Sequence, residues 1–423
     1  MYVPIIIDPC AFYDYRYLWE YLKYLYHSYR NNWAIVSTHE YENYKEKHSI
    51  SNAYEKEFYE CHQYRILDRT EEIAVKKYFI EDSVFDELEK EIGSKLGAKI
   101  YLLKYRYRPL EREIKRILRL IQKENGEKIE GILNWNAHFK SVRYVAEKMG
   151  IPVITNEFSI RFPDFYPLSY FCLKDIYEEQ EIKKLFLRFQ KEIKLLHIPL
   201  LTRKEILCLF IHDSMLNKID DFEKITPKYE IGVAGCHPLI ATFFAKSTYT
   251  DLELIEDVRK AYSEDDILFR KHPGDEPYQA RYTVKNLDNS VSVLDFILKC
   301  KRITAIGSNT LVEAMLLGKP IFSKTISPFT VFAEKDLLNK ESGYVNEEVL
   351  NFIFFVYFSP YNKIFDEDYI TWRIKEQRTD KIYERNICYY FEQMNIKQEI
   401  LYLNNNRYEA ILKSRLENRN DQI

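Results

Sequence analysis

Short apolar segments that alternate with amphipathic helices constrain the fold of this 423-residue chain more than any other feature. In the second half, the sequence predicts strands at 229–234, 267–269, 291–293 and 302–306, and helices at 251–262, 294–299 and 310–317. Strands separated by helices of this length are expected to pair in parallel, with the helices covering the sheet. The second half is therefore predicted to be a Rossmann-like α/β domain, with functional groups at the carboxyl ends of its strands.

The first half repeats this alternation less regularly. Strands are predicted at 3–7, 32–37, 128–135 and 152–155, while residues 55–124 are charged with a mostly helical pattern. The strand–helix–strand order around residues 128–155 again favours a parallel sheet.

The length of the chain favours two domains rather than one hydrophobic core. A charged connector over 217–228 contains Pro227 near its end, and the domain boundary is placed there. The prediction is one Rossmann-like domain over 1–227, a second over 228–390, and a helical tail over 391–423. Helices are expected over most of the C-terminal part, and one of them is expected to cross back onto the first domain.

Three basic residues follow the strand predicted at 267–269. Arg270, Lys271 and His272 stand at its carboxyl end, directly before the turn signal Pro273-Gly274. They form either a solvated strand end or an anion site. Because a polar helix start follows about three dozen residues later, phosphate binding is favoured, with His272 as the contact and Arg270 or Lys271 as charge support.

That helix start is the second polar cluster. Ser308, Asn309 and Thr310 stand where the helix predicted at 310–317 begins, and Glu313 lies one turn further on. Free backbone N–H groups at a helix start favour an anion, and hydroxyl side chains add donors. Ser308 and Asn309 are equally ordinary N-cap residues, and Glu313 is equally a capping partner.

Two more segments join these two clusters, which gives four sequence motifs in a defined order along the chain. Upstream lies Asn156-Glu157-x-x-x-Arg161-x-Pro163, and downstream lies Asp368-Tyr-Ile-Thr-Trp-Arg373. Together with the two central motifs, they resemble the bacterial transferases that use CMP-activated ulosonic acids. The closest resemblance is to the retaining β-Kdo transferases, which are related to bacterial sialyltransferases.

The resemblance implies a GT-B-like fold, in which two Rossmann-like domains face a cleft and a helical segment ends the chain. The N-terminal domain would take the acceptor and the C-terminal domain the CMP-sugar. His272, Ser308, Asn309 and Thr310 would contact the CMP phosphate, and Glu313 would hold a ribose hydroxyl.

The resemblance also places chemistry on the segment after the strand predicted at 152–155. It implies a substrate contact for Asn156 and a general acid/base role for Glu157, which requires a raised pKa. Arg161 would hold the ulosonate carboxylate in a bidentate pair. A plain surface carboxylate at Glu157 and an ion pair between Arg161 and Asp164 are the alternatives.

A retaining mechanism by double displacement also needs a carboxylate nucleophile. The segment 232–240 contains no Asp or Glu, although relatives carry an acid near this place. Asp213 is therefore the first candidate, with Asp164 and Asp175 as alternatives. Cys172 also stands where an acid is expected, although a buried cysteine is more often inert packing.

The composition of the chain limits which binding partners and which cellular compartment we expect. Lys+Arg number 62 and Asp+Glu 65, and this near-neutral balance argues against a nucleic-acid partner. Seven scattered cysteines without a CxxC pair favour neither zinc nor disulfides and indicate a reducing cytoplasm. We expect no signal peptide and no apolar run of the ~18 residues that span a bilayer. Peripheral contact with the inner membrane remains an alternative, for example through the basic aromatic stretch 104–108.

The sequence therefore predicts a cytoplasmic glycosyltransferase that moves Kdo, or a related ulosonic acid, from a CMP-sugar to a surface-polysaccharide or lipopolysaccharide acceptor. Its expected partners are a nucleotide-sugar donor and a glycan or lipid-linked oligosaccharide. No cofactor and no catalytic metal are expected, because a CMP-sugar carries a single phosphate. The alternatives are a sialyltransferase using CMP-sialic acid, a transferase using a UDP- or GDP-sugar, and a non-catalytic nucleotide- or glycan-binding subunit of a polysaccharide assembly complex.

Overall fold

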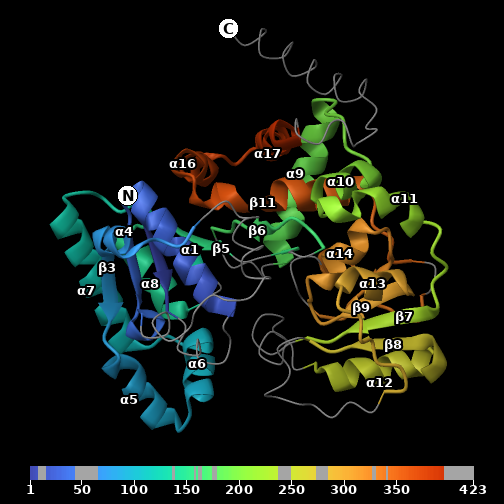
Figure 1. Ribbon diagram of the computed structural model, residues 1–423, viewed down its shortest axis with the longest axis horizontal. Coiled ribbons are helices and arrows are strands. Elements are labelled where there is room, and N and C mark those ends of the chain that lie inside the picture. Colours follow the sequence, from blue (N-terminus) through green and yellow to red (C-terminus); the bar gives the residue numbers. More distant parts are fainter. Residues whose placement is uncertain are drawn as a thin grey trace. The chain divides into compact units, whose positions relative to one another are not determined.

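A computed structural model describes residues 1–7, 16–42, 65–135, 139–156, 159–160, 164–173, 179–236, 249–272, 284–325, 330–339 and 342–394. The chain divides into two compact units (Figure 1). Unit 1 comprises residues 1–157, 170–176 and 362–374, and unit 2 comprises residues 158–169, 177–361 and 375–423. Each unit contains its own parallel sheet with helices, which confirms the predicted α/β class and the two Rossmann-like domains.

Unit 1 is built on a five-stranded parallel sheet with the order β3-β2-β1-β4-β5. Its strands are β1 (Tyr2–Ile6), β2 (Ala34–Thr38), β3 (Lys76–Ile80), β4 (Gly131–Trp135) and β5 (Val153–Asn156). Its helices are α1 (Arg16–Asn31), α4 (Arg69–Ala74), α5 (Ser83–Ile92), α6 (Lys95–Lys104), α7 (Arg108–Asn125), α8 (Lys140–Met149) and α16 (Glu367–Lys375).

Burial explains these elements. Strands β1, β2 and β5 are buried along their whole length, as expected for strands covered on both faces. Helix α7 buries an apolar stripe at helical spacing, formed by Leu110, Ile114, Ile117, Leu118 and Ile121, and Gly126 ends the helix with a left-handed backbone conformation. The sequence prediction missed β3 because this edge strand begins with Lys76-Lys77 and only its last residue is fully buried.

Unit 2 contains a four-stranded parallel sheet with the order β10-β9-β7-β8 and a two-stranded pair, β11-β6. The strands are β6 (Leu168–Tyr170), β7 (Tyr229–Ala234), β8 (Ile267–Arg270), β9 (Cys300–Ala305), β10 (Ile321–Phe322) and β11 (Phe358–Pro360). The α-helices are α9 (Glu179–Leu195), α10 (Arg203–Phe210), α11 (Ile219–Phe222), α12 (Asp251–Ala261), α13 (Val293–Leu298), α14 (Thr310–Leu316), α15 (Glu347–Phe352) and α17 (Thr379–Met394). Short 3-10 turns cover Asp213–Lys218, Glu264–Asp266 and Thr330–Phe332, and a π-helical turn covers Ile353–Tyr357. A further 3-10 turn, Tyr361–Phe365, begins at the last residue of this part of unit 2 and continues into unit 1.

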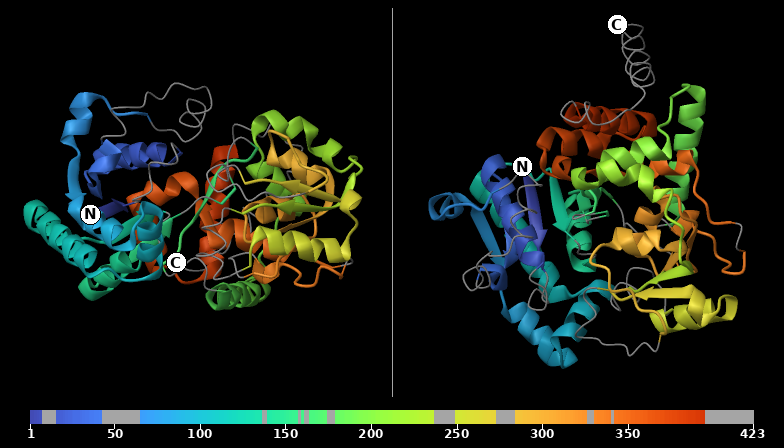
Figure 2. Two further views of the ribbon diagram at one scale, coloured as in Figure 1. Left: turned by 90° about the horizontal axis from the view of Figure 1, so that it is seen from below. Right: turned by 45° about the vertical axis from the view of Figure 1, so that its right-hand side comes forward.

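The four-stranded sheet of unit 2 lies between two layers of helices. In Figure 1, α12 lies below the sheet and α13 and α14 lie above it, and the two views of Figure 2 show the same layers from other sides. Leu254 and Val258 of α12 share one buried cluster with Ile231 of the central strand β7 and Phe269 of the edge strand β8. This packing fixes β7 and β8, whose carboxyl ends carry the predicted site.

The division into units differs from the boundary predicted at residue 227. Residues 177–227 belong to unit 2 because α9 and α10 pack on the C-terminal helices. Phe189 of α9 lies 5.4 Å from Tyr383 of α17, measured between ring centroids. Asn351 of α15 binds both backbone groups of Leu201, at 3.0 and 2.7 Å.

Two other predictions for the C-terminal part have different outcomes. Residues 362–374 return to unit 1, which confirms that a C-terminal helix crosses back onto the first domain. The strand predicted at 291–293 is wrong, because Ser292 caps α13 and Val293 is already helical. The predicted tail lies outside the described residues from 395 onward.

Candidate functional site

Three strands of unit 2 end side by side at one edge of the sheet. Ala234 of β7 pairs with Arg270 of β8 on one side and with Ala305 of β9 on the other. The chain passes from β7 to β8 and then to β9 on the opposite side of β7, so a topological switch point lies between β7 and β9. Ligands of open α/β sheets bind outside the carboxyl ends of the strands at such a point.

The loop after β7 touches the predicted basic strand end. The Gly235 N–H donates to the Arg270 carbonyl at 2.8 Å. A Cβ atom at position 235 would lie 3.0 Å from that oxygen and 3.2 Å from the His272 backbone nitrogen. Glycine therefore allows the β7 loop to pass close to His272.

The helix start after β9 forms as predicted, with α14 beginning at Thr310. Gly307 has φ +78°, which turns the chain sharply between strand and helix. The Ser308 hydroxyl accepts from the Thr310 N–H at 3.3 Å and donates to the Thr310 hydroxyl at 3.1 Å. The Asn309 carbonyl accepts from the Glu313 N–H at 3.2 Å. The Ser308 hydroxyl thus binds the first N–H of α14, although Asn309 holds the N-cap position, and Ser308, Asn309 and Thr310 all stay partly exposed.

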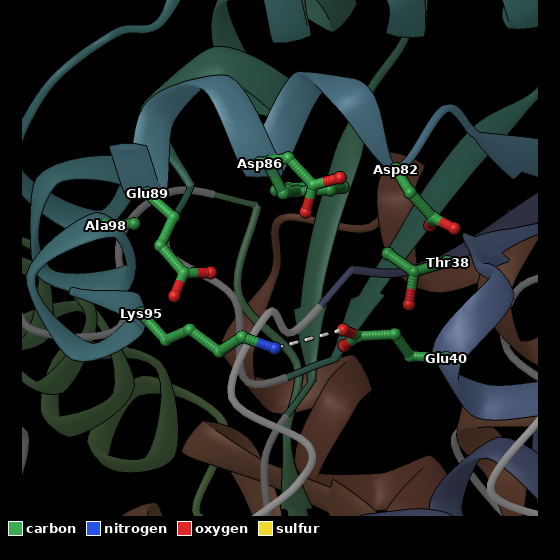
Figure 3. A pocket seen from close by; sticks show the side chains of 8 residues that line it. Thr38, Glu40, Asp82, Asp86, Glu89, Lys95 and Ala98 are labelled. Carbon is green, nitrogen blue, oxygen red and sulfur yellow. Dashed lines mark ion pairs between the residues drawn. The ribbon is translucent and has the colours of Figure 1, made fainter. Parts of the chain in front are cut away.

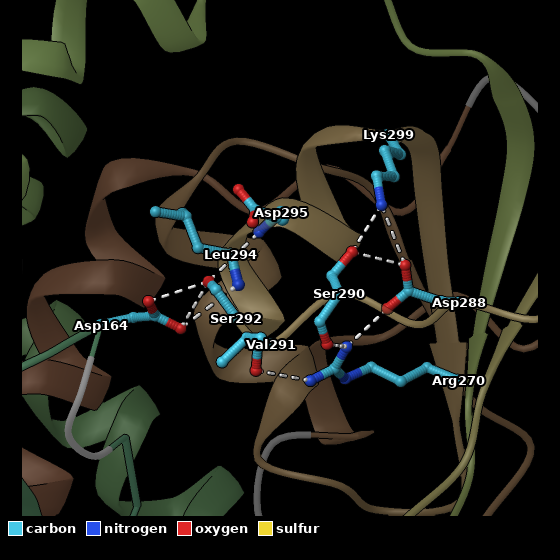
Figure 4. Close-up of polar contacts among 9 residues, drawn as sticks. All are labelled: Asp164, Arg270, Asp288, Ser290, Val291, Ser292, Leu294, Asp295 and Lys299. Carbon is cyan, nitrogen blue, oxygen red and sulfur yellow. Dashed lines mark hydrogen bonds and ion pairs between the residues drawn. The ribbon is translucent and has the colours of Figure 1, made fainter. Parts of the chain in front are cut away.

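Arg270, the last residue of β8, is held by the segment 288–291 (Figure 4). Its guanidinium forms an ion pair with the buried carboxylate of Asp288 and donates to the Ser290 carbonyl at 2.8 Å and the Val291 carbonyl at 3.2 Å. Lys299 also binds Asp288, at 3.1 Å. Burial alone would raise the pKa of Asp288, but hydrogen bonds from Ser290, Lys299 and Arg270 lower it below its ordinary value. Arg270 therefore has a structural role in fixing residues 288–291.

The other predicted donor-site residues lie at the same edge of the sheet. Lys271 is exposed and His272 is partly exposed, directly after β8. Glu313 is buried in α14. The strand register thus brings the basic strand end and the Ser308–Thr310 helix start to one edge, on either side of β7. Their contacts with a nucleotide stay predictions.

Asp251 is a contributor to this edge that sequence reasoning missed. It is the first residue of α12 and is buried, and its Oδ2 accepts from the Cys236 N–H at 2.9 Å. This bond holds the loop after β7. The signal was available as the capping box of Thr250 and Glu253, which marks the start of α12.

Asn156 is the described member of the predicted site in unit 1. It ends β5, where it pairs with Trp135 of β4. Its side chain is fully buried, and within the described structure neither its Oδ1 nor its Nδ2 has a hydrogen-bond partner. A buried amide without partners is rare and calls for an explanation. Glu157 and Arg161, the two charged residues of this motif, lie outside the described residues.

The candidate nucleophiles occupy different settings. Asp164 is buried, and both of its carboxylate oxygens accept from the Ser292 hydroxyl at 2.8 Å. Cys172 is partly buried and exchanges two backbone hydrogen bonds with Thr155. Asp213 begins a 3-10 turn directly after His212, whose N–H donates to the Asp164 carbonyl at 2.9 Å. Asp175 and the second His-Pro pair, at 237 and 238, lie outside the described residues.

Two general features of the described residues bear on cofactors and membranes. In that part of the chain, no three His, Cys, Asp or Glu side chains are grouped so that they could hold a metal ion. Across the same residues, no helix is both long enough and apolar enough to cross a bilayer.

The N-terminal part of the chain matches a known family. Residues 7–181 match the family model described as the glycosyltransferase 99 family N-terminal domain. The match includes β2 to β5 of unit 1 and the motif that begins at Asn156. It therefore supports a glycosyltransferase. No curated protein matches the chain.

Several solved structures show a weak overall likeness. The β-Kdo 2,7 transferase KpsC of Thermosulfurimonas dismutans is 15% identical, with 56% of this chain and 78% of that chain covered and a TM-score of 0.33. The UDP-GlcNAc 2-epimerase of Methanocaldococcus jannaschii, in complex with UDP-GlcNAc and UDP, is 13% identical, with 84% and 92% covered and a TM-score of 0.33. MnaA of S. aureus, solved with UDP, is 12% identical, with 92% and 96% covered and a TM-score of 0.31.

Proposed function

We propose that this protein is a glycosyltransferase that moves Kdo, or a related ulosonic acid, from a CMP-sugar to a glycan acceptor in polysaccharide synthesis. The observation that carries the proposal is the common edge of β7, β8 and β9, where His272 and the Ser308–Thr310 helix start leave the sheet around its switch point. The glycosyltransferase 99 match and the four ordered motifs support the same reading.

The proposed chemistry divides between the two units. In unit 2, the His272 side chain and the donors of Ser308 and Thr310 would stabilise the negative charge that develops on the CMP phosphate as it leaves. In unit 1, Glu157 would move a proton at the acceptor hydroxyl, and Asn156 would orient the sugar. Arg161 would pair with the ulosonate carboxylate. Asp213 is proposed as the nucleophile of a retaining mechanism.

The first experiment tests the donor site by isothermal titration of the full chain with CMP, UDP and GDP. We expect CMP to bind most tightly, and His272→Asn to weaken CMP binding about tenfold, which corresponds to about 1.4 kcal/mol. His197→Asn is the matched control, because His197 is exposed in a turn with φ +50° that asparagine tolerates.

The outcomes separate the alternatives. Tighter binding of UDP or GDP would replace the CMP-sugar with a diphosphate-activated donor. CMP binding without turnover of CMP-Kdo or CMP-sialic acid would favour a non-catalytic subunit. Comparing the turnover of these two donors would distinguish a Kdo transferase from a sialyltransferase. If no nucleotide binds, the donor site itself is refuted.

A further inference from the structure

A second candidate site lies in unit 1, at the carboxyl edge of its sheet. Residues at the ends of β2 and β3 and on helices α5 and α6 surround a small hollow (Figure 3). Its polar lining consists of Thr38, Glu40, Asp82, Asp86, Glu89 and Lys95. Thr38 is the last residue of β2, and Asp82 follows β3 by two residues. The hollow thus occupies the edge where open α/β sheets bind ligands, over β2 and β3.

The lining carries a clear excess of negative charge. Four carboxylates face one ammonium group, that of Lys95, whose Nζ lies 3.8 Å from Glu40 Oε1. Asp82, Asp86 and Glu89 make no ion pair or side-chain hydrogen bond with any residue in the described structure. Neighbouring like charges repel one another, and a bound cation relieves this repulsion. The hollow therefore suits a positively charged group and disfavours an anionic one.

A buried hydroxyl points independently to a ligand. Thr38 is only 1% exposed, and within the described residues its Oγ1 has no hydrogen-bond partner. In Figure 3 this hydroxyl faces the side of the hollow that the Glu40 carboxylate borders. A buried hydroxyl without a partner is destabilising, because it loses its hydrogen bonds to water and gains none in the fold. A ligand that donates or accepts a hydrogen bond there would remove this penalty.

The spacing of the carboxylates selects the kind of cation. No three acidic side chains of the described chain are grouped tightly enough to share one metal ion. A larger ligand with several donors, which reaches separate carboxylates at once, fits better than a compact ion. Phe85 adds an apolar surface to the lining, against which the C–H face of a sugar ring can pack.

We propose that this hollow binds an amine-bearing sugar residue, with its ammonium and hydroxyl groups donating to Glu40, Asp82, Asp86 and Glu89. The identification of this sugar as part of the acceptor glycan rests on the proposed function. The binding itself does not, because every lining residue belongs to unit 1 and none to the donor edge of unit 2.

The test is a titration of the full chain with fully deacetylated chitotetraose, with tetra-N-acetylchitotetraose as the uncharged comparison, at slightly acidic pH. The deacetylated probe is expected to bind about tenfold more tightly, and this preference should shrink as salt screens the charges. The double variant Asp86→Asn/Glu89→Gln should lose the preference. The matched control is Glu87→Gln/Glu91→Gln, which removes two exposed carboxylates from the same helix outside the hollow.

Thr38→Val gives a second, independent measurement. It keeps the branched side-chain shape and replaces the hydroxyl with a methyl group, so we expect weaker binding of the deacetylated probe by a protein that is at least as stable. Equal binding of both tetrasaccharides, equally tight binding of spermidine, or no effect of the Asp86/Glu89 double variant would each overturn the proposal. His272→Asn should leave this binding unchanged, so failure of the donor site and failure of the hollow are distinguishable.

Discussion

At the scale of single residues, Asn156 is expected to lower the stability of the fold while serving a predicted function in substrate binding. Its buried amide has no partner in the described structure. We therefore predict that Asn156→Leu, which removes both polar atoms, raises the free energy of unfolding by about 1–2 kcal/mol. The same change should abolish most glycosyl transfer. Urea unfolding and a transfer assay measure the two effects.

The matched control for Asn156 is Asn351. This asparagine is equally buried, but its side chain binds Leu201 on both backbone groups, the Glu347 carbonyl and the Tyr383 hydroxyl. Asn351→Leu should destabilise the protein by several kcal/mol, because it leaves these groups unpaired. An Asn156→Leu variant that is less stable and fully active would contradict the assignment.

His27 is the second residue-scale prediction and concerns pH. Its ring stacks on Phe365 with centroids 4.1 Å apart, and burial, with nearby Lys23 and Arg30, holds its pKa well below the ordinary value of 6.5. Below pH 6.5 the unfolded chain binds a proton that the folded chain excludes. The His27 contribution to stability is therefore complete above pH 6.5 and falls as the pH drops, by at most about 1.4 kcal/mol per pH unit.

His27→Phe tests this directly, because it keeps the stacked ring and removes the titrating group. Denaturant unfolding between neutral and mildly acidic pH should show a shallower loss of stability for the variant than for the natural chain. Two parallel pH profiles would show that His27 is not a source of acid sensitivity.

At the scale of elements, the close approach of the β7 loop to β8 gives a test of the donor edge. A Cβ atom at position 235 would lie 3.0 Å from the Arg270 carbonyl and 3.2 Å from the His272 nitrogen. Gly235→Ala is therefore predicted to displace the end of β8, to weaken CMP binding about tenfold, and to destabilise the fold by about 1–3 kcal/mol.

Gly232, which lies within β7 itself, separates the local effect at Gly235 from general destabilisation. A Cβ atom at Gly232 would lie 2.7 Å from the Cys300 Sγ and 2.9 Å from Phe296 Cζ, both within the core. Gly232→Ala should reduce stability by a similar amount without changing CMP affinity in the folded protein. If both variants lose CMP affinity equally, the close contact at Gly235 has no special role.

The elements of unit 2 also show which features can be predicted from the sequence and which cannot. The bounds of β7 and the first residue of α14 agree with prediction, because apolar strands and polar helix starts are local patterns. The partner of Arg270 could not be predicted in this way. Asp288 lies 18 residues further along the chain, and only the fold brings the two together. Asp251 was missed for the same reason, because its partner, the Cys236 N–H, lies in the loop after β7, 15 residues before it in sequence.

At the scale of the whole molecule, unit 1 is not continuous in sequence. Its sheet and α1 are joined by residues 362–374, which the chain supplies only after passing through most of unit 2. The Tyr2 and Thr371 hydroxyls lie 2.8 Å apart, and Trp33 Nε1 donates to Glu367. Tyr369 and Ile370 are almost completely buried. A cut at the boundary that the sequence suggested would therefore remove part of the core of unit 1.

This predicts that residues 1–176 alone do not form a stable fold. Burying two side chains such as Tyr369 and Ile370 contributes about 2–3 kcal/mol each, a large share of the 5–15 kcal/mol that stabilises a typical domain. Joining residues 361–375 to this fragment through a flexible linker should restore cooperative unfolding, measured by circular dichroism in urea. The control carries Tyr369→Asp and Ile370→Asp in the joined segment and should stay unfolded. Cooperative unfolding of residues 1–176 by themselves would show that the returning segment packs on a core that is already complete.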